Sequence, residues 1–177
     1  MTDAAEGRLT PLPPAGWDPS LGRVKESLGT PLNVHNVMAR HPVLLDAWLD
    51  FRNHIVKTSA LTARERELLI LRTAHNTSAA YEWKHHVVRG RAAGLTDAEI
   101  ARVREGPDAA GWSEEEALLL RAADDIHDRT EIARPAWAAM CARFDDRQLL
   151  DVIFTVGTYL IMSTVLKTAR VPMEEHP

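Results

Sequence analysis

The sequence contains repeated signals for the start of α-helices, and these restrict the folds open to the chain. From Asn33 onward, apolar residues recur at intervals of three and four, and no run of β-branched residues alternates with polar ones. Four segments begin with a capping-box pattern, in which a hydroxyl or carboxylate residue is followed three positions later by Glu or Gln. The pairs are Thr62 with Glu65, Thr96 with Glu99, Ser113 with Glu116, and Asp145 with Gln148. The predicted fold class is therefore all-α.

The same periodicity predicts eight helices around one core, since 177 residues are about the length of one domain. The predicted helices span 33–40, 43–57, 62–76, 79–93, 96–105, 113–129, 133–143 and 146–168. The last of them is apolar nearly all round, so we expect it to lie at the centre or at a subunit interface. Its stretch from Gln148 to Leu166 also carries Asp151, Gly157 and several hydroxyls, which favours a buried helix over a membrane span.

The first 32 residues are rich in helix-breaking residues, which favours an extended arm over long helices. The prolines and glycines are Pro11, Pro13, Pro14, Pro19, Pro31, Gly7, Gly16, Gly22 and Gly29. We expect an arm over 1–32, a helical domain over 33–172 and a C-terminal tail over 173–177. Leu9, Leu12 and Trp17 could dock the arm on its own domain or on a neighbouring subunit.

Composition narrows the function and the compartment. Lys and Arg number 21 against 25 Asp and Glu, with no basic stripe, so small molecules or protein partners are expected and nucleic acid is not. One cysteine, Cys141, cannot form an internal disulfide, and no signal peptide is visible, so the expected location is cytoplasmic. Cys141 shares an apolar face with Trp137, Met140 and Phe144, which is typical of a buried, unreactive thiol.

The residues most suited to chemistry fall between Leu61 and Leu95. Glu67 lies on the helical face that also carries Ile70 and Ala74, so its carboxylate should point inward and need a partner. Glu82 and His86 are four apart and can touch on one face of the next helix. A carboxylate and an imidazole in an apolar cleft can perform general acid–base catalysis, although the same spacing is also typical of a weak ion pair on an exposed helix.

These residues resemble a known family. The similarity rests on the run Arg66–Arg72, on Tyr81, Glu82, Trp83 and His86, on Gly94–Thr96 and on Phe154–Tyr159, within about residues 30–172. On these residues the chain is identified as a member of the carboxymuconolactone decarboxylase and alkylhydroperoxidase D (AhpD-like) superfamily. The resemblance implies an all-helical fold that assembles as a homotrimer or homohexamer.

The resemblance also implies which branch of the family the chain belongs to. In the peroxidase branch a Cys-x-x-Cys pair occupies the positions of Ala79 and Glu82, so dithiol chemistry is impossible here. The decarboxylase branch is similar in having a Glu and a His four apart. That likeness implies cofactor-free and metal-free loss of carbon dioxide from a lactone carboxylate by a carboxy-lyase-like enzyme. His86 would donate the proton, Glu82 would orient His86, and Glu67 would complete the relay.

Neighbouring side chains are candidates for binding the small-molecule substrate. Tyr81, Trp83 and His85 flank the Glu82–His86 pair, and Arg72 is a candidate cation for a substrate carboxylate. Lys84 and Arg89 are further candidates for that cation.

Two other classes of function use the same residues. The fold could serve as a non-catalytic oligomeric binding or scaffold module, in which Glu and His satisfy each other. Alternatively, Glu82-x-x-His85 and Asp124-x-x-His127 are both carboxylate-to-His pairs at i, i+3, as in di-metal helical bundles. We find no convincing fourth helix that supplies a carboxylate, so the metal-free scheme is preferred.

Overall fold

A computed structural model describes residues 8–174, and over that range the regular elements are all helical. The predicted all-α fold class is confirmed. Parts of the predicted arm (1–7) and of the predicted tail (175–177) lie outside the described residues.

Each of the eight predicted helices is present, and within the described residues one further α-helix precedes them. The α-helices are α1 (Gly22–Leu28), α2 (Asn33–Met38), α3 (Pro42–Asn53), α4 (Ala63–Asn76), α5 (Ala80–Ala92), α6 (Asp97–Val103), α7 (Glu114–Arg129), α8 (Arg134–Cys141) and α9 (Asp146–Thr168). Two short 3-10 turns, η1 (Pro14–Gly16) and η2 (Pro19–Leu21), come before α1, and a π-helical turn, η3 (His54–Thr58), extends α3.

The predicted capping boxes form, and they set where the helices begin. At the start of α4 the Thr62 hydroxyl accepts the Glu65 N–H at 3.2 Å, and the Glu65 carboxylate accepts the Thr62 N–H at 2.7 Å. Similar pairs of bonds cap α6, α7 and α9. A cap of this kind stabilises a helix by about 1 kcal/mol.

The chain divides into two compact units. Within the described residues, the first comprises 8–54 with 164–174, and the second comprises 55–163. Each unit has buried apolar clusters of its own.

The first unit corrects the prediction of an extended arm. Trp17, Leu21 and Val24 are buried against Leu45 and Leu49 of α3, and the Trp17 indole N–H donates to the Leu12 carbonyl at 2.9 Å. The prediction was wrong because it treated proline density as uniform. No proline falls between Pro19 and Pro31, and that interval is long enough for the two turns of α1. The arm therefore docks on its own chain.

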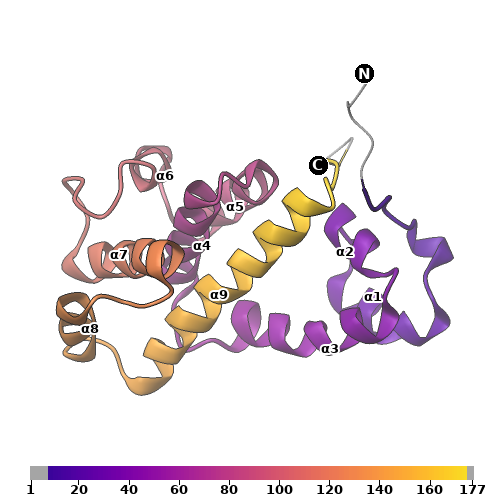
Figure 1. Ribbon diagram of the computed structural model, residues 1–177, viewed down its shortest axis with the longest axis horizontal. Helices are drawn as coiled ribbons and strands as arrows, with labels where there is room; N and C mark the ends of the chain where they lie inside the picture. The colour runs from indigo at the N-terminus through magenta and orange to yellow at the C-terminus, as the bar shows by residue number, and fades with distance from the viewer. Residues whose placement is uncertain (1–7, 175–177) are drawn as a thin grey trace. The chain divides into compact units, whose positions relative to one another are not determined.

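The second unit is arranged around α4. This helix packs against both α5 and α7 and lies between them (Figure 1). Leu68 and Leu71 of α4 are fully buried with Val103 and Leu120, while Leu69 joins the apolar cluster that α7 shares with α9. Because α4 is covered on several faces, a polar side chain on it can be held away from water.

Helix α9 has one buried and one exposed apolar side. It is long and apolar enough to cross a membrane by length and composition, with a mean hydropathy of 1.9 over its best 18-residue window. However, 56% of that window is buried, which is also typical of a core helix. Val152, Thr155 and Val156 are fully buried. The large exposed side chains are those of Leu150, Ile153, Phe154 and Ile161.

Cys141 is exposed at the end of α8, so the prediction of a buried thiol was wrong. Met140 and Phe144 are buried as expected. One residue beyond Met140, a helix turns by about 100°, which carries Cys141 away from the core.

Candidate functional site

Helix α4 carries the first candidate residue, Glu67. The side chain of Glu67 is 12% exposed, in line with the predicted inward orientation. The capping box at Thr62 fixes where α4 begins and hence which residues face α5. A carboxylate so placed requires a hydrogen-bond partner.

Helix α5 carries the other two, Glu82 and His86, on one face. Both residues are 4% exposed. That face meets α9, from which Ser163 hydrogen bonds to Glu82 and Tyr159 places its ring edge-on to His86, with ring centroids 5.0 Å apart. Tyr159 and Ser163 are themselves four residues apart, so two matched helix faces close over the polar groups.

His86 is held by Glu67. The distance from His86 Nδ1 to Glu67 Oε2 is 2.7 Å, and Arg89 Nη1 lies 3.4 Å from His86 Nε2. A guanidinium can only donate, so Nε2 is the acceptor and Nδ1 carries the proton that is donated to Glu67. Burial lowers the pKa of His86, and the hydrogen bond to Glu67 partly opposes this. At pH 7 the ring is therefore neutral, with its Nε2 lone pair directed at Arg89.

Unlike His86, Glu82 holds its titratable proton at neutral pH. Burial raises its pKa from 4.5 to about 8, although the hydrogen bond with Ser163 works in the lowering direction. Its second oxygen, Oε1, is buried without a hydrogen-bond partner among the described residues. An ionised carboxylate would leave that oxygen at a high desolvation cost, so the acid is protonated at pH 7.

Two hydroxyl groups form a row beside Glu82. Ser163 Oγ also contacts Thr77 Oγ1 at 3.0 Å, and Thr77 Oγ1 donates to the Thr73 carbonyl at 2.8 Å. The Ser163 hydroxyl donates to Glu82 Oε2, so the row links the Glu82 carboxyl group to the turn between α4 and α5.

The structure corrects one predicted contact. Glu82 was expected to orient His86, but the carboxylate that bonds the imidazole is Glu67. Residues four apart on a helix are neighbours without pointing at one another, and here Glu82 turns to Ser163 on α9. The structure brings Glu67 and His86 into one hydrogen-bonded pair and places Glu82 beside them on α5.

The predicted substrate contacts divide between two faces of α5. Tyr81 is buried and its ring centroid lies 4.7 Å from that of His85. Trp83 is half-buried and packs against the apolar cluster around Leu68 and Leu71. Trp83 therefore points about 100° away from Glu82 around α5, toward the α4 cluster.

Arg72, the candidate cation for a substrate carboxylate, is neutralised within the fold. Its guanidinium binds Asp124 of α7 through two nitrogens at 2.6 and 2.9 Å, and it also donates to the Val103 carbonyl at 2.8 Å. The side chain is 12% exposed. The cation nearest to His86 is Arg89, which was also among the candidates.

The di-metal alternative finds no support in the arrangement of side chains. Asp124, its second carboxylate, is bound by Arg72 and by the Asn76 amide at 2.7 Å. Within residues 8–174, no three His, Cys, Asp or Glu side chains lie close enough together to hold a metal ion.

Comparison with known proteins finds a family match over the central part of the chain. Residues 42–125, which include Glu67, Glu82 and His86, match the model of the Carboxymuconolactone decarboxylase family. Over these residues the chain is similar to that family, in line with the resemblance seen in the sequence. No curated protein sequence matches the chain.

Solved structures with the same fold come from several bacteria. An alkylhydroperoxidase AhpD core protein from Ralstonia eutropha JMP134 has a TM-score of 0.80 at 17% identity, covering 97% of this chain and 95% of its own. An uncharacterized peroxidase-related protein from Silicibacter sp. TM1040 has a TM-score of 0.79 at 19% identity, covering 99% and 96%. The debrominase Bmp8 in complex with 2,3,4-tribromopyrrole has a TM-score of 0.78 at 13% identity, covering 98% and 95%. At these identities the similarity shows the fold.

Residues outside the family match also contribute to the candidate site. Ser163 and Tyr159 lie on α9, beyond residue 125. The sequence signal for them is the set of hydroxyl groups on an otherwise apolar helix, which the sequence analysis used to argue for burial and not for a site. Thr77, in the turn between α4 and α5, gave no such signal.

Proposed function

We propose that this carboxymuconolactone decarboxylase-like protein is a cofactor-independent acid–base enzyme that acts on a small lactone or carboxylate. The observation that carries the proposal is the pair of buried groups in complementary states on one face of α5. Glu82 is a protonated acid and His86 is a neutral base held by Glu67. Groups whose environments set them as acid and base at the same pH are suited to moving protons.

For a decarboxylation, each group has a defined part. Arg89 binds the substrate carboxylate, and carbon dioxide leaves as the C–C bond breaks and its electron pair moves into the unsaturated lactone ring. Glu82 then gives its proton to carbon. The Glu82 carboxylate regains a proton from water through His86, whose transient positive charge is stabilised by Glu67. In this scheme Glu82 makes the first proton transfer, whereas the resemblance to the decarboxylase branch implied His86.

The test measures carbon dioxide release from 4-carboxymuconolactone, with the product analysed by NMR after reaction in D₂O. We expect one deuterium on the ring carbon that takes up the delocalised electron pair. Glu82→Gln should abolish both signals, and the exposed Glu105→Gln should leave them unchanged. No release from this or related small lactones, together with a ligand that binds at the site and is recovered unchanged, would favour the non-catalytic binding module.

We also propose that the protein is a homo-oligomer, a trimer or a hexamer, that assembles through α9. Leu150, Phe154 and Ile161 are 54%, 50% and 62% exposed and lie along one side of that helix together with Ile153. Contiguous apolar patches of this kind are typical of interfaces. Light scattering should give the mass of three or six chains, and Phe154→Asp should reduce it. A monomer that co-sediments with phospholipid vesicles would contradict this assembly.

A further inference from the structure

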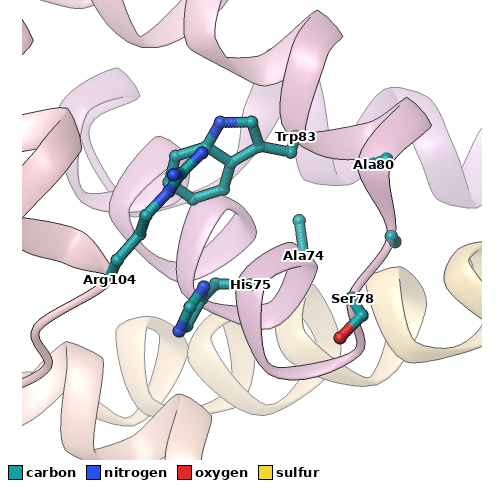
Figure 2. Close-up of a pocket in the computed structure, with 7 residues that line it drawn as sticks. Ala74, His75, Ser78, Ala80, Trp83 and Arg104 are labelled. Atoms are coloured by element: carbon teal, nitrogen blue, oxygen red, sulfur yellow. The ribbon is translucent and has the colours of Figure 1, made fainter.

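A cavity opens beside the N-terminal end of α5 (Figure 2). Its volume is about 300 Å³, at the lower end of the range for small-molecule pockets. Ala74, Ala79 and Ala80 supply an apolar wall, and Trp83 supplies a flat aromatic surface. The size and lining suit a small molecule with an apolar body.

The cavity is separate from the acid–base site. None of Glu67, Glu82 and His86 lines it. Trp83 follows Glu82 in the chain and so points about 100° away from it around α5. A ligand here would occupy a different place from the substrate proposed above.

Arg104 gives the cavity a positive charge that has no carboxylate partner within residues 8–174. Its guanidinium lies over the Trp83 ring, 4.3 Å from the centroid, and within the described residues it donates to no carboxylate or carbonyl. Arg72 and Arg64, by contrast, are both paired with carboxylates. Arg72 also donates to the Arg104 carbonyl at 3.2 Å, which fixes the end of α6 at the cavity.

Two further polar groups at the cavity have side chains without a hydrogen-bond partner in the part of the chain that the structure describes: His75 and Ser78. The His75 ring lies edge-on to Trp83 at 6.3 Å between centroids. Partial burial, followed by the charges of Arg72 and Arg104, lowers the pKa of His75, while Asp124 opposes this. At pH 7 the neutral imidazole and the hydroxyl can each donate a hydrogen bond.

We propose that this cavity is a second small-molecule site, which binds an organic carboxylate with an apolar body about the size of a benzene ring. The carboxylate lies against the Arg104 guanidinium, whose planar set of N–H donors matches its two oxygens. His75 and Ser78 donate the remaining hydrogen bonds. The apolar body rests on the alanine wall beside Trp83. The proposal does not depend on the acid–base chemistry, because binding is measured without turnover.

Isothermal titration of the full chain with benzoate tests the proposal, with neutral benzamide as the isosteric control. We expect a saturable benzoate signal with a Kd on the order of 1 mM, as befits so small a ligand. Benzamide and the Arg104→Gln variant should each bind at least about tenfold more weakly, the effect of losing one charge-assisted hydrogen bond.

Matched variants separate this site from general effects of charge. Arg102→Gln removes another α6 arginine that stacks on a tryptophan, at 5.2 Å from Trp112, and should leave benzoate binding unchanged. Ala80→Leu, at an exposed position, should fill the cavity and weaken binding as Arg104→Gln does. Benzoate that does not saturate, or that binds equally well to Arg104→Gln or to Ala80→Leu, would overturn the proposal.

Discussion

The two faces of helix α5 make opposite use of their polar groups. On the face toward α9, Glu82 and His86 are buried and are bonded to Ser163 and Glu67. On the face toward the end of α6, Arg104 lies beside an open cavity and forms no ion pair with any residue that the structure describes. The first face holds protons in defined positions, and the second offers an uncompensated charge. One helix can therefore serve two roles because its sides face different surroundings.

The largest expected effect concerns the buried acid. The pKa of Glu82 is raised from 4.5 to about 8, so between these pH values the folded chain holds a proton that the unfolded chain releases. The free energy of unfolding therefore falls as pH rises from about 4.5 to 8 and levels off above that. Glu82→Gln removes this penalty. The variant should exceed the parent by on the order of 4 kcal/mol at pH 9 and by little at pH 4.

Urea unfolding at pH 4, 7 and 9 measures this difference, with Glu105→Gln as the exposed control. Parallel stability profiles for the parent and Glu82→Gln would show that Glu82 ionises normally, and the contrast between the two faces of α5 would be lost.

The second prediction concerns the base on the same face. His86→Ala should lower the rate of carbon dioxide release by roughly 10²-fold or more, the typical contribution of a positioned acid or base, while the chain stays folded. His127→Ala, on α7, should retain the parental rate. Steady-state kinetics with circular dichroism checks both variants, and full activity in His86→Ala would remove this residue from the mechanism.

A third variant should act on the cavity face and spare the other. Arg72→Lys loses the two-nitrogen bond to Asp124 and the support of the Arg104 carbonyl. We expect a loss of about 1–3 kcal/mol in the free energy of unfolding and weaker benzoate binding. The rate of carbon dioxide release should change little. An equal loss of rate and of binding would mean that the two faces are coupled.

The smallest expected effect is at Ser163. Its hydrogen bond lowers the pKa of Glu82, so Ser163→Ala should raise that pKa further, by less than about one unit. A ¹³C-NMR titration of the Glu82 carboxyl group measures the change. A fall in the pKa would instead show that Ser163 mainly stabilises the protonated acid.

Local rules explain why the helices could be predicted. The capping boxes at Thr62, Thr96, Ser113 and Asp145 link residues three apart, and such bonds form wherever the segment becomes helical. Two local predictions were wrong for identifiable physical reasons. The arm contains α1 because its prolines are unevenly spaced, and Cys141 is exposed because the buried face of α8 turns away one residue earlier.

In the candidate site, too, some features follow from the sequence and others only from the packing of the helices. By itself, the sequence determined that Glu67 lies on an inward face and that Glu82 and His86 share one, because helical periodicity fixes direction. The packing of the helices determines that His86 bonds to Glu67, that Ser163 bonds to Glu82, and that Arg72 forms an ion pair with Asp124. These partners come from different helices. Their identity depends on how α4, α5, α7 and α9 pack, which no spacing within one helix specifies.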